Sequence, residues 1–341
     1  MRKSLILIAL LSFIIIGGMM PPIGGKPKPL KLNQPEGWPQ ANDIFKNNPL
    51  TEEGFQLGRK LFYDGRLSKD GKFACSSCHQ QFAAFATFDH DLSHGFNDQF
   101  TTRNAPAIQN MAWIDKYHWD GSISSLEIQA LKPITAPNEM AEDVETILKK
   151  LKADKLYPAL FAKAFGDKQI TEERMLKALA QFTGSMVSAD SKYDRVKKGK
   201  DKFNAAEAHG YELFKTHCAS CHKEPLFTDN SFRNNGLTVD NYLLDYGRMM
   251  VTGNPEDSLK FRVPSLRNAG VTQPYMHDGR FYSLDKVVEH YATGIAPSAT
   301  LDSLLQKKMN LYPRDKYDLV RFLYTLTDSS FIADKRLAAP E

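Results

Sequence analysis

Two copies of a five-residue pattern contain every cysteine of the chain. They are Cys75-Ser76-Ser77-Cys78-His79 and Cys218-Ala219-Ser220-Cys221-His222. C-x-x-C-H is the attachment signature of a c-type haem, in which both thiols add across the vinyl groups of one porphyrin. The histidine that follows is then placed to ligate the iron from the proximal side. The sequence therefore predicts two covalently bound haem c groups, with His79 and His222 as iron ligands.

Two other kinds of site use paired cysteines. Two redox-active C-x-x-C pairs or one shared zinc site would also account for four cysteines. Neither explains why a histidine directly follows both pairs, so the dihaem interpretation is preferred.

The composition is that of a soluble globular protein. The chain has 341 residues, of which 42% are hydrophobic and 25% are charged, a length that suits two domains. The formal net charge is only +4, and no dense run of Lys and Arg follows a recognition motif. We therefore expect no nucleic-acid partner, whereas docking to an acidic electron donor is compatible with this charge.

The N-terminus has the pattern of an export signal. Arg2 and Lys3 precede an apolar run over 5–16, which is shorter than the roughly 20 residues that a bilayer-spanning helix needs. We interpret 1–25 as a signal peptide or a retained N-terminal anchor, and the proline-rich stretch 26–44 as a linker. Because bacterial c-type haems are attached outside the cytoplasm, we expect a periplasmic protein.

The order of several short motifs is repeated in the second half of the chain. The paired motifs are Gly58-Arg59-Lys60-Leu61-Phe62 with Gly210-Tyr211-Glu212-Leu213-Phe214, Arg103-Asn104-Ala105 with Arg267-Asn268-Ala269, Trp119-Asp120-Gly121 with His277-Asp278-Gly279, and Ser125-Leu126 with Ser283-Leu284. Such self-similarity indicates two copies of one unit. We expect a mostly α fold of two cytochrome-c-like haem domains related by internal duplication, an N-terminal domain over 45–190 and a C-terminal domain over 191–335.

Helical periodicity and capping residues predict six helices. The expected ranges are 52–63 after the cap Thr51, 140–151, 171–188, 204–216, 283–291 and 314–326. Long loops are expected between them, because a prosthetic group fills much of each small core.

The repeat also predicts a difference between the two irons. Tyr291 lies seven residues after Leu284, and Pro133 lies seven residues after Leu126. Tyrosine can ligate haem iron, whereas proline cannot, so the first iron would have an open position and the second would be closed. The alternative is that Tyr291 is a core aromatic residue of an amphipathic helix.

Further motifs resemble one known family. They are Trp119-Asp120-Gly121, Gln129, Pro133 and Glu139-Met140 in the first half, and Val263-Pro264-Ser265-Leu266-Arg267-Asn268 and Pro274-Tyr275-Met276-His277-Asp278-Gly279 in the second. In combination they resemble the bacterial dihaem cytochrome c peroxidase family, which includes the MauG-type enzymes. The resemblance covers about residues 45–330.

The resemblance assigns catalytic roles around the first haem. It implies that this haem is peroxidatic and the second relays electrons, with Glu139 as distal carboxylate, Gln129 as its neighbour and Trp119 between the haems. A carboxylate at this place could move a proton between the two oxygens of hydrogen peroxide. The alternatives are that Glu139 is a first-turn acid of the 140–151 helix and that Trp119 only packs.

Other assignments depend on the resemblance alone. Asn104, Thr272 and Pro274 match an inter-domain calcium site, whose oxygen donors suit that ion. His94, or less readily His90, matches a loop histidine that caps the peroxidatic iron at rest; the alternative for either is a solvated loop histidine.

Three functions are compatible with these residues. The first is a peroxidase that reduces hydrogen peroxide to water with electrons from a small cytochrome c or cupredoxin, which His94 favours. The second is a MauG-like enzyme that uses peroxide to oxidise side chains of a partner protein, storing oxidising equivalents across both irons and Trp119. Tyr291 favours this second function, since the MauG-type members have tyrosine where the peroxidases commonly have methionine, and Met276 and Met309 are out of register. The third is a dihaem electron carrier. A homodimer is compatible with the resemblance, and we rank the peroxidase first.

Overall fold

A computed structural model describes residues 25–341 of the chain. Within them the protein is mostly helical, and its one sheet has two short strands, which confirms the mostly α fold class. The predicted signal peptide or anchor over 1–25 lies, except for its last residue, outside the described residues. Among the described helices, none has both the length and the apolar character needed to cross a membrane.

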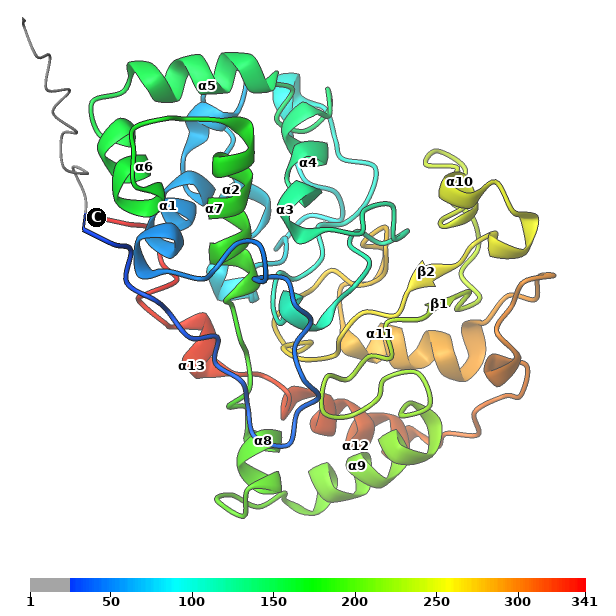
Figure 1. Cartoon of the computed structure of the whole chain (residues 1–341). Helices are drawn as coiled ribbons and strands as arrows, with labels where there is room; N and C mark the ends of the chain where they lie inside the picture. The colour runs from blue at the N-terminus through cyan, green and yellow to red at the C-terminus, as the bar shows by residue number, and fades with distance from the viewer. Residues whose placement is uncertain (1–24) are drawn as a thin grey trace, which may run out of the picture.

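The first half of the molecule holds the helices that surround the first C-x-x-C-H motif (Figure 1). They are α1 (Glu52–Phe62), α2 (Cys75–Cys78), α3 (Leu126–Gln129), α4 (Leu131–Thr135), α5 (Val144–Ala153), α6 (Tyr157–Phe165) and α7 (Glu172–Gly184).

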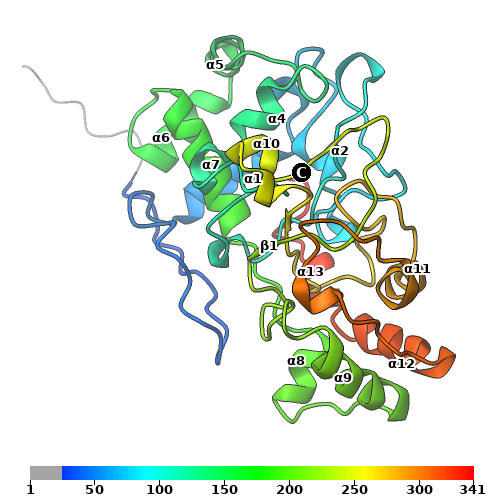
Figure 2. The same cartoon turned by 90° about the vertical axis from the view of Figure 1, so that its right-hand side faces the viewer.

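The second half gathers around the second motif. Its elements are α8 (Lys192–Lys197), α9 (Ala205–His217), β1 (Phe232–Arg233), α10 (Met249–Thr252), β2 (Phe261–Arg262), α11 (Leu284–Glu289) and α12 (Pro313–Tyr324). The short α13 (Ser329–Ile332) follows in the chain but packs on the first half. The strands β1 and β2 pair antiparallel. Figure 2 shows α8, α9 and α12 together at one end of the molecule, away from α5 and α6.

Capping side chains explain where the predicted helices begin. Thr51 accepts a hydrogen bond from the N–H of Gly54 at the start of α1, and Asn204 accepts one from Glu207 at the start of α9. The helix expected over 140–151 is a partial error, because Asp143 caps α5 and the helix begins only at Val144. Residues 137–140 form a turn instead. Seven described helices lie outside the six expected ranges; they are α2, α3, α4, α6, α8, α10 and α13.

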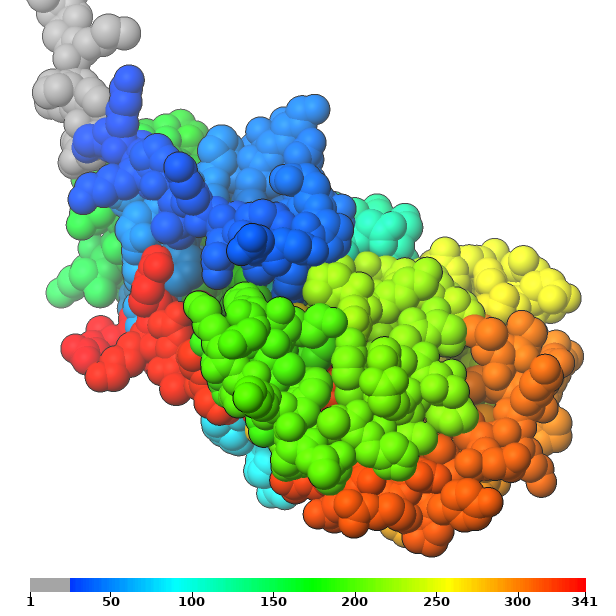
Figure 3. Space-filling view, turned by 90° about the horizontal axis from the view of Figure 1, so that it is seen from below, coloured from blue at the N-terminus to red at the C-terminus, as the bar shows by residue number. Residues whose placement is uncertain are grey.

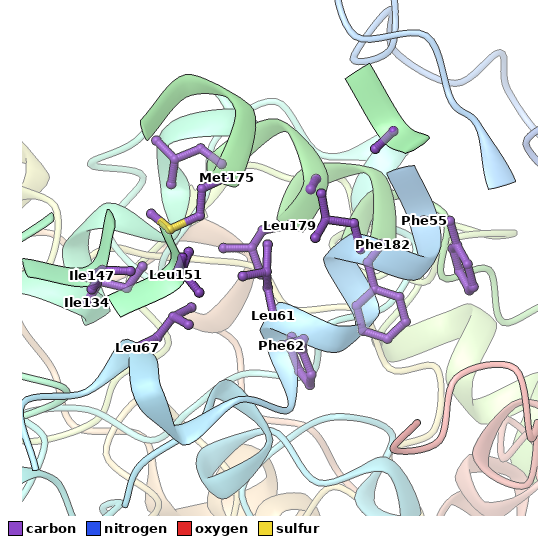
Figure 4. Packing of buried hydrophobic residues seen from close by; sticks show 14 of the residues in the cluster. Phe55, Leu61, Phe62, Leu67, Ile134, Ile147, Leu151, Met175, Leu179 and Phe182 are labelled. Carbon is purple, nitrogen blue, oxygen red and sulfur yellow. The ribbon is translucent and has the colours of Figure 1, made fainter. Parts of the chain in front are cut away.

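A close crossing of α1 and α7 forms the core of the first half. Phe55 and Phe62 of α1 pack edge to face on Phe182 of α7, with ring centroids 5.4 and 5.2 Å apart (Figure 4). A Cβ atom on Gly58 would lie only 1.9 Å from the carbonyl oxygen of Ala178. The backbones therefore approach closely because residue 58 has no side chain.

The second half contains a crossing of the same kind between α9 and α12. A Cβ atom on Gly210 would lie 1.9 Å from the carbonyl oxygen of Asp318 and 2.9 Å from Cβ of Phe322. In the first half the corresponding distance, from residue 58 to Cβ of Phe182, is also 2.9 Å. Both halves thus cross their first and last long helices at a glycine beside a phenylalanine.

The end of the chain returns to the first half. Phe331 of α13 packs against Phe85 with ring centroids 5.7 Å apart, and Leu337 is buried in the same core. The guanidinium of Arg59 on α1 donates to the carbonyl oxygen of Ala338 at 2.6 Å. Figure 3, seen from below, accordingly shows the red C-terminal residues at the end opposite the orange segment that precedes and begins α12.

The segment 26–44, predicted as a linker, contacts both halves. Trp38 packs edge to face on Trp113 of the first half, with ring centroids 5.0 Å apart. The guanidinium of Arg267, from the second half, lies 4.5 Å from the ring centroid of Trp38. Ala41 is buried beside Trp113. The bounds of the linker and of the two domains stay predictions.

Candidate haem-binding and peroxide site

A tight turn after α2 orients the first motif histidine. The ring Nδ1 of His79 donates to the carbonyl oxygen of Phe85 at 2.8 Å. Ala84 and Phe85 adopt left-handed backbone conformations, which bring that carbonyl back under the ring. Because Nδ1 is engaged and burial lowers the pKa of His79, the neutral ring keeps Nε2 available as a metal ligand.

The second motif histidine is held in the same way. The Nδ1 of His222 lies 3.1 Å from the carbonyl oxygens of both Phe227 and Pro264. Phe227, like Phe85, has a positive φ angle. The two predicted proximal histidines therefore share one local geometry, and their Nε2 atoms are not engaged by these bonds.

The thiols of the two motifs are not arranged as one shared metal site. Burial raises the pKa of Cys75 and that of Cys218 to about 12, and all four cysteines are free of disulfides. Within residues 25–341 no group of three or more His, Cys, Asp or Glu side chains is arranged to hold a metal ion. This arrangement tells against the shared zinc site.

Tyr291 lines the same cavity as the second motif. Cys218, Cys221 and His222 form one part of that cavity wall and Tyr291 another. Burial raises the pKa of Tyr291 to about 12, and a contact with the Asn235 side chain partly offsets the rise.

Two further side chains of this cavity bear on the ligand question. Met276 and Met309, which the repeat places out of register, also line the cavity. The amide of Asn235 donates to the sulfur of Met276 at 3.5 Å. Asn235 therefore contacts both Tyr291 and Met276, a role that no motif in the sequence signals.

In the first half, a turn brings Glu139 next to Pro133. The N–H of Met140 donates to the carbonyl oxygen of Pro133 at 3.1 Å, and that of Glu139 to Ala136 at 3.0 Å. The turn therefore folds back on α4. Glu139 is not a first-turn acid of α5, which begins at Val144, so that alternative is wrong.

The carboxyl of Glu139 lies close to the first haem motif. Its charge contributes, after burial, to raising the pKa of the Cys78 thiol. Burial raises the pKa of Glu139 itself, while the positive charge of Lys132 acts against that rise. A half-buried carboxyl with a raised pKa beside the attachment cysteine is suited to acid–base work.

Trp119 lies at the junction of the two halves. Its indole N–H donates to the carbonyl oxygen of Asn104 at 2.8 Å, and its own carbonyl accepts from the N–H of Arg262 at 2.7 Å. It is buried and lines the cavity of the second motif. Gln129, half-buried, ends α3 in the first half.

The loop that carries His94 is exposed. The rings of His90 and His94 are 5.1 Å apart, and His94 is 4.5 Å from the ring of Phe100, which is itself 53% exposed. Close by, the N–H of Phe96 donates to the carbonyl oxygen of Glu139 at 2.7 Å. The loop is therefore attached to the turn that holds the candidate distal carboxyl.

The three residues expected at a calcium site line one cavity. Asn104, Thr272 and Pro274 all lie on the wall that Trp119 shares. The side-chain amide of Asn104 donates to the carbonyl oxygen of Asp91 at 2.9 Å, which places carbonyl oxygens near this residue. Calcium at this place stays a prediction.

Comparisons with known proteins identify the family of this chain. A sequence model of the family described as "Di-haem cytochrome c peroxidase" matches residues 52–202. The methylamine utilization protein MauG of Methylorubrum extorquens is 37% identical over 302 residues, which cover 87% of this chain and 83% of that protein. The cytochrome c551 peroxidase of Nitrosomonas europaea is 36% identical over 255 residues, covering 71% and 73%. The chain belongs to the dihaem cytochrome c peroxidase and MauG family.

A solved structure extends the similarity to three dimensions. The crystal structure of a MauG-like protein associated with microbial copper homeostasis superimposes with a TM-score of 0.84 at 34% identity. The match covers 91% of this chain and 99% of that one. The protein is therefore an oxidoreductase with two haem c groups, which confirms the family, the enzyme class and the cofactor expected from the two C-x-x-C-H motifs.

Proposed function

We propose that the protein is a periplasmic peroxidase that reduces hydrogen peroxide to water at its first haem. The observation that carries this proposal is the position of Glu139, next to Pro133 and within electrostatic reach of Cys78. In the overall reaction the O–O bond breaks, and one peroxide, two electrons and two protons give two water molecules. The two haems supply the redox-active iron.

The residues of this chain would direct peroxide and protons. His79, fixed by its bond to Phe85, would hold the first iron. Pro133 has no donor atom in its side chain, so at the position that the repeat pairs with Tyr291 the first half would leave room for peroxide. Glu139 takes a proton from the near oxygen and returns it to the leaving one, while Gln129 orients peroxide without titrating.

The second half would receive electrons. We propose that His222 and Tyr291 ligate the second iron, and that Trp119 lies on the route between the irons. A small cytochrome c or cupredoxin would supply the electrons. His94 would cap the first iron at rest and calcium would join the halves through Asn104, Thr272 and Pro274.

We also infer that the two halves derive from one haem-binding unit. The glycine crossings at Gly58 and Gly210 and the matched bonds of His79 and His222 support this inference.

A second candidate function has an observation of its own. The position of Tyr291, on the wall of the cavity that the second motif lines, favours a MauG-like enzyme that uses peroxide to oxidise side chains of a partner protein. The similarity to proteins named MauG supports it. An anionic oxygen ligand would lower the reduction potential of the second iron and so hinder electron supply from a high-potential donor.

Peroxide titration of the purified holoprotein separates the two functions. With a reduced small cytochrome present, a peroxidase oxidises that cytochrome steadily. A MauG-like enzyme leaves it reduced and shows instead a long-lived change in its own haem spectrum. If peroxide causes neither cytochrome oxidation nor a spectral change, both functions are wrong and the electron carrier remains.

A further inference from the structure

Arg262 is a buried cation for which the part of the chain that the structure describes supplies no salt-bridged carboxylate. It ends β2, is 7% exposed, and lines the cavity of the second motif. Among the described residues, no carboxylate forms a salt bridge with its guanidinium. The negative charge of Asp115 acts to raise the pKa of Arg262, but from beyond salt-bridge distance. Burial lowers the pKa of Arg262 to about 10, so the group stays protonated at neutral pH.

Neighbouring arginines show how unusual this is. Arg233, which lines the same cavity, pairs with Asp229 and Asp302 at 2.8 Å each. Arg267, fully buried, pairs with Asp194 at 2.8 Å. Burying a guanidinium without an anion is energetically unfavourable, because the charge loses its hydration without gaining a partner. The cavity in front of Arg262 must therefore receive an anion if the charge is to be compensated.

The remaining contacts of Arg262 hold it against the Trp119 loop. The backbone N–H of Arg262 donates to the carbonyl oxygen of Trp119 at 2.7 Å, and its side-chain Nε donates to the carbonyl oxygen of His118 at 3.4 Å. No hydrogen bond within the described residues engages its two terminal nitrogens. A guanidinium presents these nitrogens as a fork that fits a carboxylate with two parallel bonds.

We propose that Arg262 binds a propionate of the second haem and thereby couples that haem to the Trp119 loop. This inference rests on the second haem occupying the cavity of Cys218, Cys221 and His222, as proposed above. The propionate is a carboxylate carried by the group that the cavity receives, so it needs no further ligand. Arg262 is a positioning residue: it touches the haem periphery, and its backbone touches the carbonyl of Trp119.

The test is a spectroelectrochemical titration of the holoprotein with separate potentials for the two haems. In Arg262→Gln the reduction potential of the second haem should shift downward, because loss of a nearby positive charge stabilises the oxidised iron. The propionate-bending band of that haem in resonance Raman spectra should shift as well. Arg262→Lys keeps the charge but not the fork, so its potential should stay close to the wild type while the Raman band still moves.

Arg248→Gln is the matched control. Arg248 donates to the carbonyl oxygen of Asp120 at 3.0 Å and stacks on Phe232, but it does not line the cavity. Its loss should change neither readout. An unshifted second-haem potential and Raman band in Arg262→Gln, or a shift confined to the first haem, would overturn the proposal. If Arg262→Gln does not fold, an unshifted Raman band in Arg262→Lys would also overturn the proposal. Neither readout depends on peroxide turnover, so these measurements test the role of Arg262 even if the protein is not a peroxidase.

Discussion

The two halves of the molecule share a backbone plan and differ at single side chains. Each crosses its first and last long helices at a glycine and ties its motif histidine to the carbonyl of a phenylalanine. A backbone hydrogen bond closes the loop that contains Trp119, from the N–H of Tyr117 to the carbonyl oxygen of Ile123 at 2.7 Å. The loop that contains His277 is closed in the same way, from the N–H of Tyr275 to the carbonyl oxygen of Phe281 at 2.8 Å. The differences between the halves described below therefore lie in side chains.

The differences lie at positions that the sequence repeat pairs with each other. The repeat pairs Pro133 of the first half with Tyr291 of the second, and Trp119 with His277. His277 stacks on Phe261 at 3.7 Å, whereas Trp119 donates a hydrogen bond to Asn104. Chemical asymmetry can therefore arise from a few substitutions on one scaffold.

The largest expected effect is loss of the distal acid–base group. Glu139→Gln should lower peroxide turnover about 10²–10⁴-fold, while both haems stay attached. Steady-state oxidation of a reduced cytochrome measures it, and the exposed first-turn acid of α5 provides the control Glu145→Gln, which should turn over normally. Unchanged turnover in Glu139→Gln would remove the functional difference between the halves.

The pH dependence of wild-type turnover tests the same group. Burial raises the pKa of Glu139, and the group acts as a base only when ionised. Turnover per unit peroxide at low substrate should therefore rise as pH rises through a value above the ordinary 4.5 of a glutamate. In Glu139→Gln this step should be missing.

The next effect sharpens the difference between the two irons. Tyr291→Phe removes the phenol oxygen from the second cavity, so the absorption and electron paramagnetic resonance signals of one haem should change while those of the other stay constant. Tyr282→Phe, at a tyrosine that is 55% exposed, should change neither. If the spectra of Tyr291→Phe match the wild type, another residue closes the second iron, and Met276 becomes the first candidate.

A smaller effect is expected where Leu337, near the C-terminus, packs into the core of the first half. Leu337→Ala should lower the free energy of unfolding by about 2–5 kcal/mol, because Leu337 is buried in the core around α1 and α7. Thermal unfolding followed at the spectrum of each haem should show the first haem affected before the second. Leu304→Ala, at a half-exposed leucine of the second half, is the control. Equal effects of Leu337→Ala on both haems would contradict the assignment of this residue to the first half.

The smallest effect probes what the halves share. An added methyl at Gly58 or Gly210 meets a carbonyl oxygen that cannot rotate away. Overpacking costs about 1–3 kcal/mol, and the gain in helix propensity is at most about 1 kcal/mol. Gly58→Ala and Gly210→Ala should therefore destabilise the protein by similar amounts in chemical denaturation. A loss at one position only would show that the two crossings are not equivalent.

The sequence predicts those features whose determinants are local. Side-chain caps such as Thr51 and Asn204 define helix starts within a few residues, and the C-x-x-C-H motifs carry their chemistry in five adjacent positions. The helix expected from Met140 begins only at Val144, because the side chain of Asp143 accepts a hydrogen bond from the N–H of Thr146 and so caps the helix there.

Long-range relations could not be predicted in this way. The contact of Arg59 with Ala338 spans 279 positions, and no pattern near either residue reports it. The missing partner of Arg262 is likewise a property of the space around the side chain. Hydropathy patterns identify polar residues, but they do not show which of them remain uncompensated once buried.

The return of residues 329–341 to the first half has a consequence for folding. Phe331 packs on Phe85, whose carbonyl oxygen positions His79, although 246 positions separate the two phenylalanines. The core around the first motif is therefore complete only when this distant segment has docked on it. The orientation of the first motif histidine thus depends on a long-range closure of the chain as well as on the local turn.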